Sequence, residues 1–134
     1  MAQTVFADTF YFLGLLNRAD ESHAKCVAFS QRFQGELVTT EYVLVELADG
    51  LASPRYRLKV SEFIRALKAN PRVEIVWAAR DLFERASMLY ARRADKEWSL
   101  TDCIAFTVMT DKGLRDALTA DHHFEQAGFT ELLK

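Results

Sequence analysis

Proline, cysteine and glycine are all scarce in this sequence of 134 residues, which contains two prolines, two cysteines and five glycines. Such a composition excludes a collagen-like, low-complexity or disulfide-rich chain. Cys26 and Cys103 lie far apart and lack the paired spacing of zinc ligands, so we expect two reduced, buried thiols. A domain of this length buries roughly 68% of its unfolded surface, so its fold needs neither a disulfide nor a structural metal.

Long apolar runs and an excess of basic charge are also missing. The longest nearly continuous apolar segment, residues 10–16, is too short to span a bilayer, and no basic stretch precedes it as in a signal peptide. We therefore expect a soluble, cytoplasmic protein that does not bind a membrane. The net charge is −2, with 17 Lys and Arg residues against 19 Asp and Glu residues. Any binding to a polyanion would depend on local basic patches or on a metal.

Short apolar segments alternate with longer amphipathic ones along the chain. The pattern predicts strands over residues 4–7, 36–39, 73–77 and 117–120, and a short fifth strand within 129–133. It predicts helices over about 10–16, 24–33, 41–51, 54–70, 79–93 and 99–112. This alternation indicates one domain over residues 1–134, with an α/β fold in which a central, mostly parallel sheet lies between two helical layers.

Capping signals mark the start of several helices. Thr40 is expected to cap the helix that begins near Glu41, and Pro54 to open the next helix. Ser99 and Asp102 form an S-x-x-D capping box at the start of a later helix. Asp102 therefore has a structural explanation as well as a functional one.

Three further acidic residues are candidates for a site. Asp8 comes directly after the first predicted strand and Asp121 directly after the fourth, so both would emerge at the edge where parallel sheets bind ligands. Each could equally be a helix cap or a turn residue. Glu46 is expected to face inward, because it borders the apolar stripe of its helix, where an unpaired carboxylate is costly. A solvated helix edge is the alternative for Glu46.

Together, Asp8, Glu46, Asp102 and Asp121 can point into one cleft. At an effective dielectric near 20, two like charges about 4 Å apart repel by roughly 4 kcal/mol, so such a cluster needs divalent cations or raised pKa values. Ligands that are all oxygen select Mg²⁺ or Mn²⁺. A hard cation that keeps bound water suits phosphodiester hydrolysis, which is the reaction class that the four acids indicate.

Other polar residues near these acids are weaker candidates. His122 and His123 are expected at the surface rather than at a metal, because they face opposite sides if their segment is extended, and a helical turn is expected before the fifth strand. Arg92, Arg93 and Lys96 precede the helix that carries the capping box, so they are candidate contacts for the phosphates of a nucleic acid such as RNA. Most surface charges, however, interact only with water.

Four segments, taken in order, resemble the PIN domain and, in length and layout, the VapC-type toxins of bacterial toxin–antitoxin pairs. The segments are residues 5–9 (VFADT), 39–47 (TTEYVLVEL), 99–106 (SLTDCIAF) and 118–124 (LTADHHF). By this resemblance the four acids would be the metal-binding and catalytic residues. Thr9 and Thr101 would be neighbouring polar residues that touch metal-bound water or phosphate. Phe10 departs from the family, in which many members carry a small polar residue there.

The resemblance also implies a function and partners. It implies a Mg²⁺-dependent ribonuclease, with Mn²⁺ as the alternative ion, that forms a homodimer and is neutralised by a small cognate antitoxin. A PIN nuclease that processes RNA without being a toxin is one alternative. A receiver-like signalling domain that binds Mg²⁺ at strand-end aspartates is another, although a matching lysine site is missing. A silent module that uses the acids to bind a partner's arginine is the third.

Overall fold

In the computed structural model, which describes residues 3–134, five strands form one sheet in the order β3-β2-β1-β4-β5. The strands are β1 (Thr4–Ala7), β2 (Glu36–Thr40), β3 (Val73–Val76), β4 (Asp116–Leu118) and β5 (Thr130–Glu131). Each strand runs parallel to its neighbours, so the expected α/β fold is confirmed and the sheet is parallel throughout.

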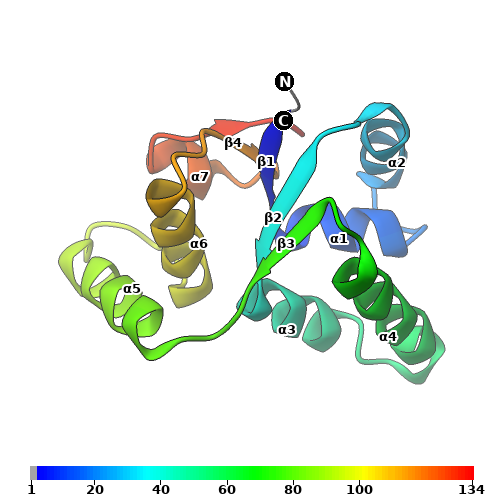
Figure 1. Cartoon of the computed structure of the whole chain (residues 1–134), viewed down its shortest axis with the longest axis horizontal. Coiled ribbons are helices and arrows are strands. Elements are labelled where there is room, and N and C mark those ends of the chain that lie inside the picture. Colours follow the sequence, from blue (N-terminus) through cyan, green and yellow to red (C-terminus); the bar gives the residue numbers. More distant parts are fainter. Residues whose placement is uncertain (1–2) are drawn as a thin grey trace.

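Helices cover both faces of this sheet (Figure 1). On one face lie α1 (Thr9–Leu16), α2 (His23–Arg32), α3 (Glu41–Gly50) and α4 (Pro54–Ala69), and on the other lie α5 (Arg80–Arg92), α6 (Leu100–Asp111) and α7 (His122–Gln126). The chain first moves outward from β1 to β3 and then returns to add β4 and β5 on the other side of β1. Because parallel crossovers are right-handed, this reversal places the later helices on the opposite face.

The capping signals are confirmed. Thr40 Oγ1 accepts a hydrogen bond from Val43 N at 3.1 Å, and Pro54 is the first residue of α4. Ser99 and Asp102 form both hydrogen bonds of a capping box at α6. These local interactions explain why the starts of α3, α4 and α6 can be predicted from the sequence.

The end of β4 was predicted wrongly. The strand stops at Leu118, so Asp121 follows it after two further residues instead of directly. The chain turns at Thr119, whose amide donates to Ala117 O at 3.0 Å and whose Oγ1 accepts from Asp121 N at 3.0 Å. This turn carries Asp121 from the strand to the start of α7.

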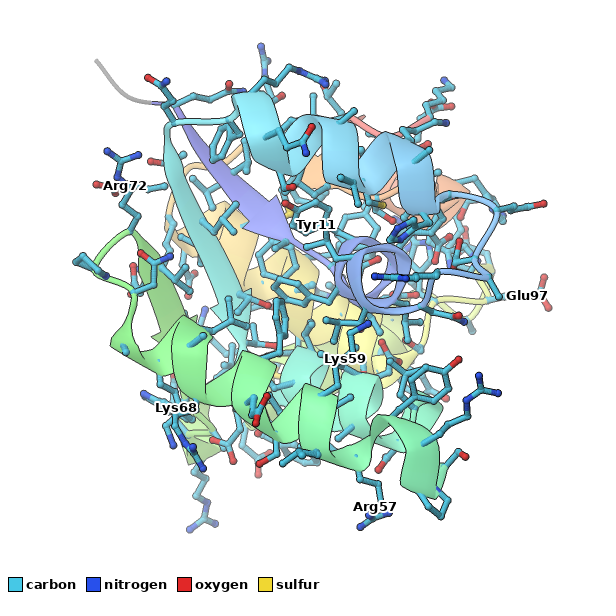
Figure 2. All side chains as sticks on the ribbon, turned by 90° about the vertical axis from the view of Figure 1, so that its right-hand side faces the viewer. Tyr11, Arg57, Lys59, Lys68, Arg72 and Glu97 are labelled. Carbon is cyan, nitrogen blue, oxygen red and sulfur yellow. The ribbon has the colours of Figure 1, made fainter. Side chains whose placement is uncertain are left out.

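Aromatic and aliphatic side chains fill the space between the sheet and the two helical layers. Phe124 packs against Phe6 and, edge to face, against Phe106, which joins α7 to the sheet and to α6. On the other face Tyr11, which is labelled in Figure 2, is buried and meets Phe29 edge to face. Both cysteines are free and buried, as expected.

Polar contacts at the surface complete the packing of the outer helices. Lys59 of α4, shown in Figure 2, donates to the carbonyl oxygen of Leu16 at the end of α1 at 2.8 Å. A cation at the carboxyl end of a helix also interacts favourably with the helix dipole. No helix within residues 3–134 is long and apolar enough to cross a membrane.

Candidate functional site

The reversal in strand order lies between β1 and β4, and the space between the loops that leave the carboxyl ends of these two strands is here called the crevice. In parallel sheets this is where ligands bind, because the loops that follow the two strands diverge to opposite faces. Asp8 follows β1 directly, and the turn that contains Thr119 follows β4. Residues from the two ends of the described chain therefore meet at this edge.

Asp8 is buried in this crevice, with 7% of its surface exposed. It occupies the N-cap position of α1, but its side chain makes no cap hydrogen bond, so capping does not explain it. Its Oδ2 instead accepts a hydrogen bond from Thr119 Oγ1 at 2.9 Å. Burial, with smaller contributions from the nearby charges of Asp102 and Glu46, raises the pKa of Asp8 to about 7 against the opposing hydrogen bonds.

Glu46 is connected to the same crevice through Thr9. The Thr9 hydroxyl, which lies next to Asp8 in the sequence, donates a hydrogen bond to Glu46 Oε1. Glu46 itself is exposed, so the expectation that it faces inward was wrong. Its position on α3 turns the carboxylate toward the start of α1 at the solvent side of the crevice. A helix edge that reaches both water and Thr9 explains why a charged residue borders the apolar stripe.

Asp102 serves two structural purposes at once. Its Oδ2 accepts from Ser99 N at 3.1 Å within the capping box, and the same atom lies 3.0 Å from Nδ1 of His123. The capping explanation is therefore correct but incomplete. The side chain is largely buried between α6 and α7 and is close enough to Asp8 to raise its pKa.

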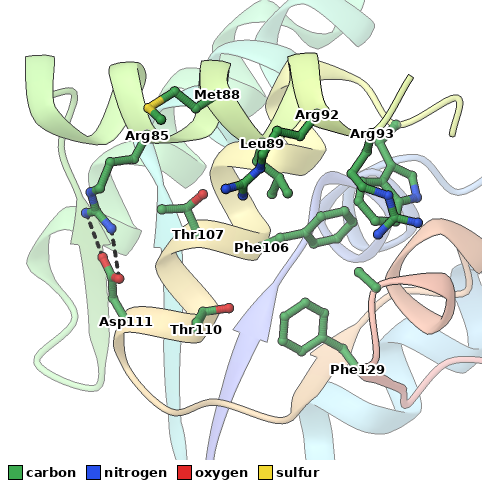
Figure 3. Close-up of a pocket in the computed structure, with 12 residues that line it drawn as sticks. Arg85, Met88, Leu89, Arg92, Arg93, Phe106, Thr107, Thr110, Asp111 and Phe129 are labelled. Atoms are coloured by element: carbon green, nitrogen blue, oxygen red, sulfur yellow. Dashed lines mark hydrogen bonds and ion pairs between the residues drawn. The ribbon is translucent and has the colours of Figure 1, made fainter. Parts of the chain in front are cut away.

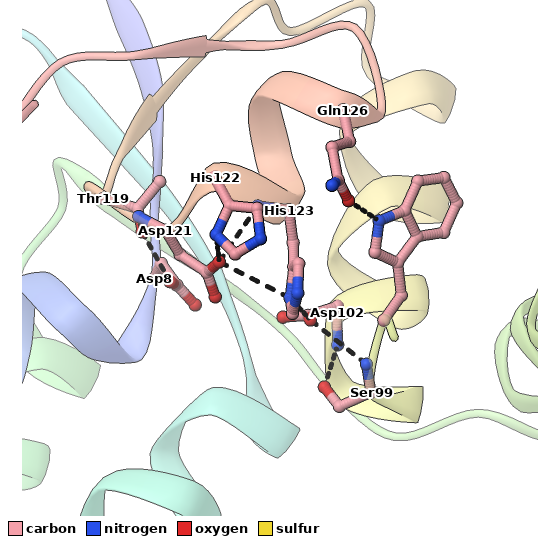
Figure 4. Close-up of polar contacts among 9 residues, drawn as sticks. Asp8, Ser99, Asp102, Thr119, Asp121, His122, His123 and Gln126 are labelled. Carbon is pink, nitrogen blue, oxygen red and sulfur yellow. Dashed lines mark hydrogen bonds and ion pairs between the residues drawn. The ribbon is translucent and has the colours of Figure 1, made fainter. Parts of the chain in front are cut away.

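Asp121 is the N-cap of α7 and lies beside the same histidine. Its Oδ1 accepts from His123 N at 2.9 Å and lies 3.4 Å from His123 Nδ1. Figure 4 shows the resulting chain of contacts, which runs from Asp8 through Thr119 and Asp121 to His123 and Asp102. The four candidate acids are thus brought together, three of them through this chain and Glu46 through Thr9.

The two histidines differ from the sequence-based expectation. His122 is at the surface as expected, with 73% of its side chain exposed, whereas the expectation was wrong for His123, whose side chain is only 19% exposed. The segment is the first turn of α7 rather than extended, so both rings lie near Asp121 and their centroids are 4.5 Å apart. Thr119 and His123 were missed as site residues. Thr119 lies two residues before Asp121 and His123 two residues after it, and this spacing was the signal in the sequence that could have identified them.

The donor set of the crevice fits a hard divalent cation. Within residues 3–134 none of the four carboxylates forms an ion pair with a lysine or an arginine, since all such pairs involve other acids. Uncompensated carboxylates around a buried Asp8 are the environment that Mg²⁺ or Mn²⁺ neutralises. Asp121, His122 and His123 also bring one nitrogen or oxygen atom each within 4.8 Å of one another, but the two imidazole nitrogens suit Mg²⁺ less well than carboxylate oxygens, so the histidines are not included in the candidate cation site.

Among the described residues, the candidate RNA contacts Arg92, Arg93 and Lys96 form no ion pair with the four acids. Arg92 and Arg93 line a cavity of about 410 Å³ between α5 and α6, with Phe106 and Phe129 also in its lining (Figure 3). Arg93 is paired with Asp95 at 3.0 Å and stacks over Trp98. Lys96 is 3.9 Å from the same aspartate. The half-buried Thr101 lies in the first turn of α6 and, among the described residues, its side chain makes no hydrogen bond.

Solved structures of similar fold come from several bacteria. VapC20 of Mycobacterium tuberculosis, described as a toxin that cleaves the sarcin–ricin loop, matches with a TM-score of 0.85 and 26% identity over 96% of this chain and 98% of that chain. FitAcB from Neisseria gonorrhoeae matches with a TM-score of 0.66 and 16% identity over 95% and 94% of the two chains. VapBC2 from Rickettsia felis, solved with a DNA fragment of its promoter, matches with a TM-score of 0.65 and 11% identity over 96% and 97%.

The family is shown by the sequence itself. No curated protein sequence matches the chain significantly. The model of the PIN domain, however, matches residues 5–130, which include all four acids of the crevice and nearly the whole described fold. The chain therefore belongs to the PIN domain family.

Proposed function

We propose that this chain is a metal-dependent endoribonuclease in which Asp8, Glu46, Asp102 and Asp121 hold Mg²⁺ or Mn²⁺. The observation that carries the proposal is the gathering of four carboxylates at one edge of the sheet without a lysine or arginine partner among residues 3–134. Membership of the PIN family supports nuclease activity, and oxygen ligands support a hard cation.

Each part of the crevice would contribute in a different way. A bound divalent cation would supply a water of lowered pKa and would neutralise charge on the phosphate oxygens. Asp8, the buried acid, is oriented by Thr119. Glu46 is the exposed acid, so an incoming phosphodiester meets it first, and Thr9 fixes its direction. Restricting these side chains before the substrate arrives removes a large entropic part of the barrier.

The proposed biological role is that of a toxin in a toxin–antitoxin pair. VapC20 supports this role, because it is described as a toxin and its likeness to this chain extends over almost the full length of both chains. The likeness to chains from VapBC2 and from the FitAB complex supports an antitoxin as partner. The proposal includes a homodimer. It also includes a cytoplasmic location, because the protein would meet the RNA target and the antitoxin there.

Cleavage of structured RNA tests the proposed activity. The purified protein is incubated with a sarcin–ricin stem-loop RNA and with an unrelated stem-loop of equal length, in Mg²⁺ and in EDTA. We expect cleavage in Mg²⁺, none in EDTA, and a rate reduced at least about 100-fold in Asp8→Asn and Asp102→Asn, because each removes a charge from the crevice. The control is Asp49→Asn, which changes an exposed aspartate of α3. Equal cleavage in all samples would rule out the mechanism.

A further inference from the structure

We propose that His123 is a positioning residue that holds Asp102 and Asp121 in the arrangement that binds the divalent cation. The inference rests on the proposed metal site and adds to it a residue that is not one of the four acids. It concerns the free protein before RNA binds, so it can be tested by cation binding alone.

The imidazole of His123 lies between the two aspartates. Its Nδ1 is 3.0 Å from Oδ2 of Asp102 and 3.4 Å from Oδ1 of Asp121. An ionised carboxylate oxygen only accepts hydrogen bonds, so the Nδ1 proton is donated to Asp102, while Asp121 accepts from the backbone amide of His123 and lies within ion-pair distance of its ring. The two aspartates come from different elements, the start of α6 and the cap of α7. One side chain therefore connects two acids that repel each other.

The same contacts leave one oxygen of each aspartate available. Oδ2 of Asp102 accepts hydrogen bonds from Ser99 N and from Nδ1 of His123. Oδ1 of Asp121 accepts a hydrogen bond from the backbone amide of His123. Among residues 3–134 no hydrogen bond reaches Oδ1 of Asp102 or Oδ2 of Asp121. The donors thus fix the direction of each carboxylate through one oxygen and leave the other for a cation. Hydrogen-bond donors of this kind typically change metal affinity 10-fold to 100-fold.

His122 provides a contrast within the same turn. It is exposed, and its Nδ1 is 3.8 Å from Asp121 Oδ1, which is too far for a hydrogen bond. It has the same chemistry as His123 and the neighbouring position, yet it makes no ion pair or hydrogen bond with Asp102 within the described part of the chain. His122→Ala is therefore a matched control for His123→Ala.

Binding of Mn²⁺ to the full chain tests the inference, with calorimetry in the absence of RNA and circular dichroism for the melting temperature. We expect wild type and His122→Ala to bind with the same Kd and His123→Ala to bind about tenfold more weakly while it remains folded at the temperature of the titration. His123→Asn places an amide N–H at about the position of Nδ1, so we expect it to recover most of the affinity. A merely structural role would not give this recovery.

Other results would overturn the inference. If His123→Ala binds Mn²⁺ as wild type does, the histidine does not position the acids. If His122→Ala loses as much affinity as His123→Ala, or if the bound Mn²⁺ shows nitrogen coupling in its electron spin resonance spectrum, the imidazoles are ligands. If wild type itself does not bind Mn²⁺, both the proposed function and the inference fail, whereas the first two outcomes leave the metal site intact.

Discussion

Asp8 is held in an environment that favours its neutral form when no cation is bound. Its carboxyl is buried among other acids, and only hydrogen bonds from Thr119 and from the backbone of Thr9 oppose this effect. A carboxyl that is costly to ionise in the folded protein makes folding depend on pH. A cation bound at the proposed site would remove this cost, and the stability of the fold would then depend on metal binding.

The metal-free protein should lose stability as the pH rises from about 4 to about 7. The pKa of Asp8 is raised from 3.8 to about 7 in the folded state. Below pH 3.8 Asp8 is therefore protonated in both the folded and the unfolded protein, and its ionisation costs no stability. Above about 7 both are ionised and the penalty is complete, on the order of 4 kcal/mol. Urea unfolding in EDTA across this pH range measures it. Asp8→Asn should remove this component, and an unchanged pH dependence in the variant would assign it to another group.

Thr119 should be important because its hydroxyl makes two buried contacts. It donates to Asp8 and accepts from Asp121 N, and the residue is fully buried. Thr119→Val keeps the shape but leaves both partners unsatisfied, so we expect a loss of about 1–3 kcal/mol in the free energy of unfolding, measured with urea. Thr110→Val on the exposed face of α6 is the control and should change stability by less than about 0.5 kcal/mol. Equal effects would mean that these contacts do not stabilise the turn.

At the scale of the helices, N-caps differ in whether their side chains are used. Ser99 caps α6 through its Oγ and closes a box with Asp102, while Ser53 holds the N-cap position of α4 without a side-chain cap hydrogen bond. Ser99 and Ser53 therefore hold equivalent N-cap positions, but only the side chain of Ser99 accepts a hydrogen bond from the first turn of its helix.

Replacing these two serines should give different results. Ser99→Ala should lower the free energy of unfolding by about 1 kcal/mol, because the first turn of α6 loses its acceptor. Ser53→Ala should have almost no effect, since no such bond exists there. Urea unfolding of the two variants compares them directly. A loss of the same size in both would show that the capping contact of Ser99 contributes nothing of its own.

The elements were predictable where local chemistry defines them. Thr40, Pro54 and the pair Ser99 and Asp102 fix helix starts through contacts within a few residues. The end of β4 was not predictable in this way, because its three residues stop where Thr119 turns to contact Asp8 of a distant strand. The error at His123 follows from the same segment, since its burial depends on α7 being helical beside Asp102.

The site as a whole depends on contacts between residues far apart in the sequence. The resemblance to the PIN family identified the four acids as a set, but the central place of β1 and the reversal between β1 and β4 come from the sheet order. The apolar periodicity of a single segment carries no information about the order of the strands in the sheet. Physical reasoning on the sequence therefore found the candidate residues, and the structure was needed to show how Thr119, Thr9 and His123 connect them.

Divalent cations should stabilise the whole molecule. Binding only to the folded state at 100 times the Kd adds about 2.7 kcal/mol, so Mg²⁺ or Mn²⁺ should raise the melting temperature and EDTA should reverse the change. Scanning calorimetry with and without the cation measures the effect. Asp102→Asn should show a much smaller rise, while Asp49→Asn should match wild type. A rise of equal size in all three would place the cation outside the crevice.

The sheet order also determines when this protein can first act during its own synthesis. Asp8 is made early, but its neighbours Thr119, Asp121 and His123 follow more than a hundred positions later. A ribosome that is translating the middle of the message carries a chain with an incomplete crevice. Since β4 must pair with β1 to complete it, a partly made chain would lack the complete set of acids on which the proposed cleavage of RNA depends. The proposed activity would therefore begin only after translation has passed β4 and α7.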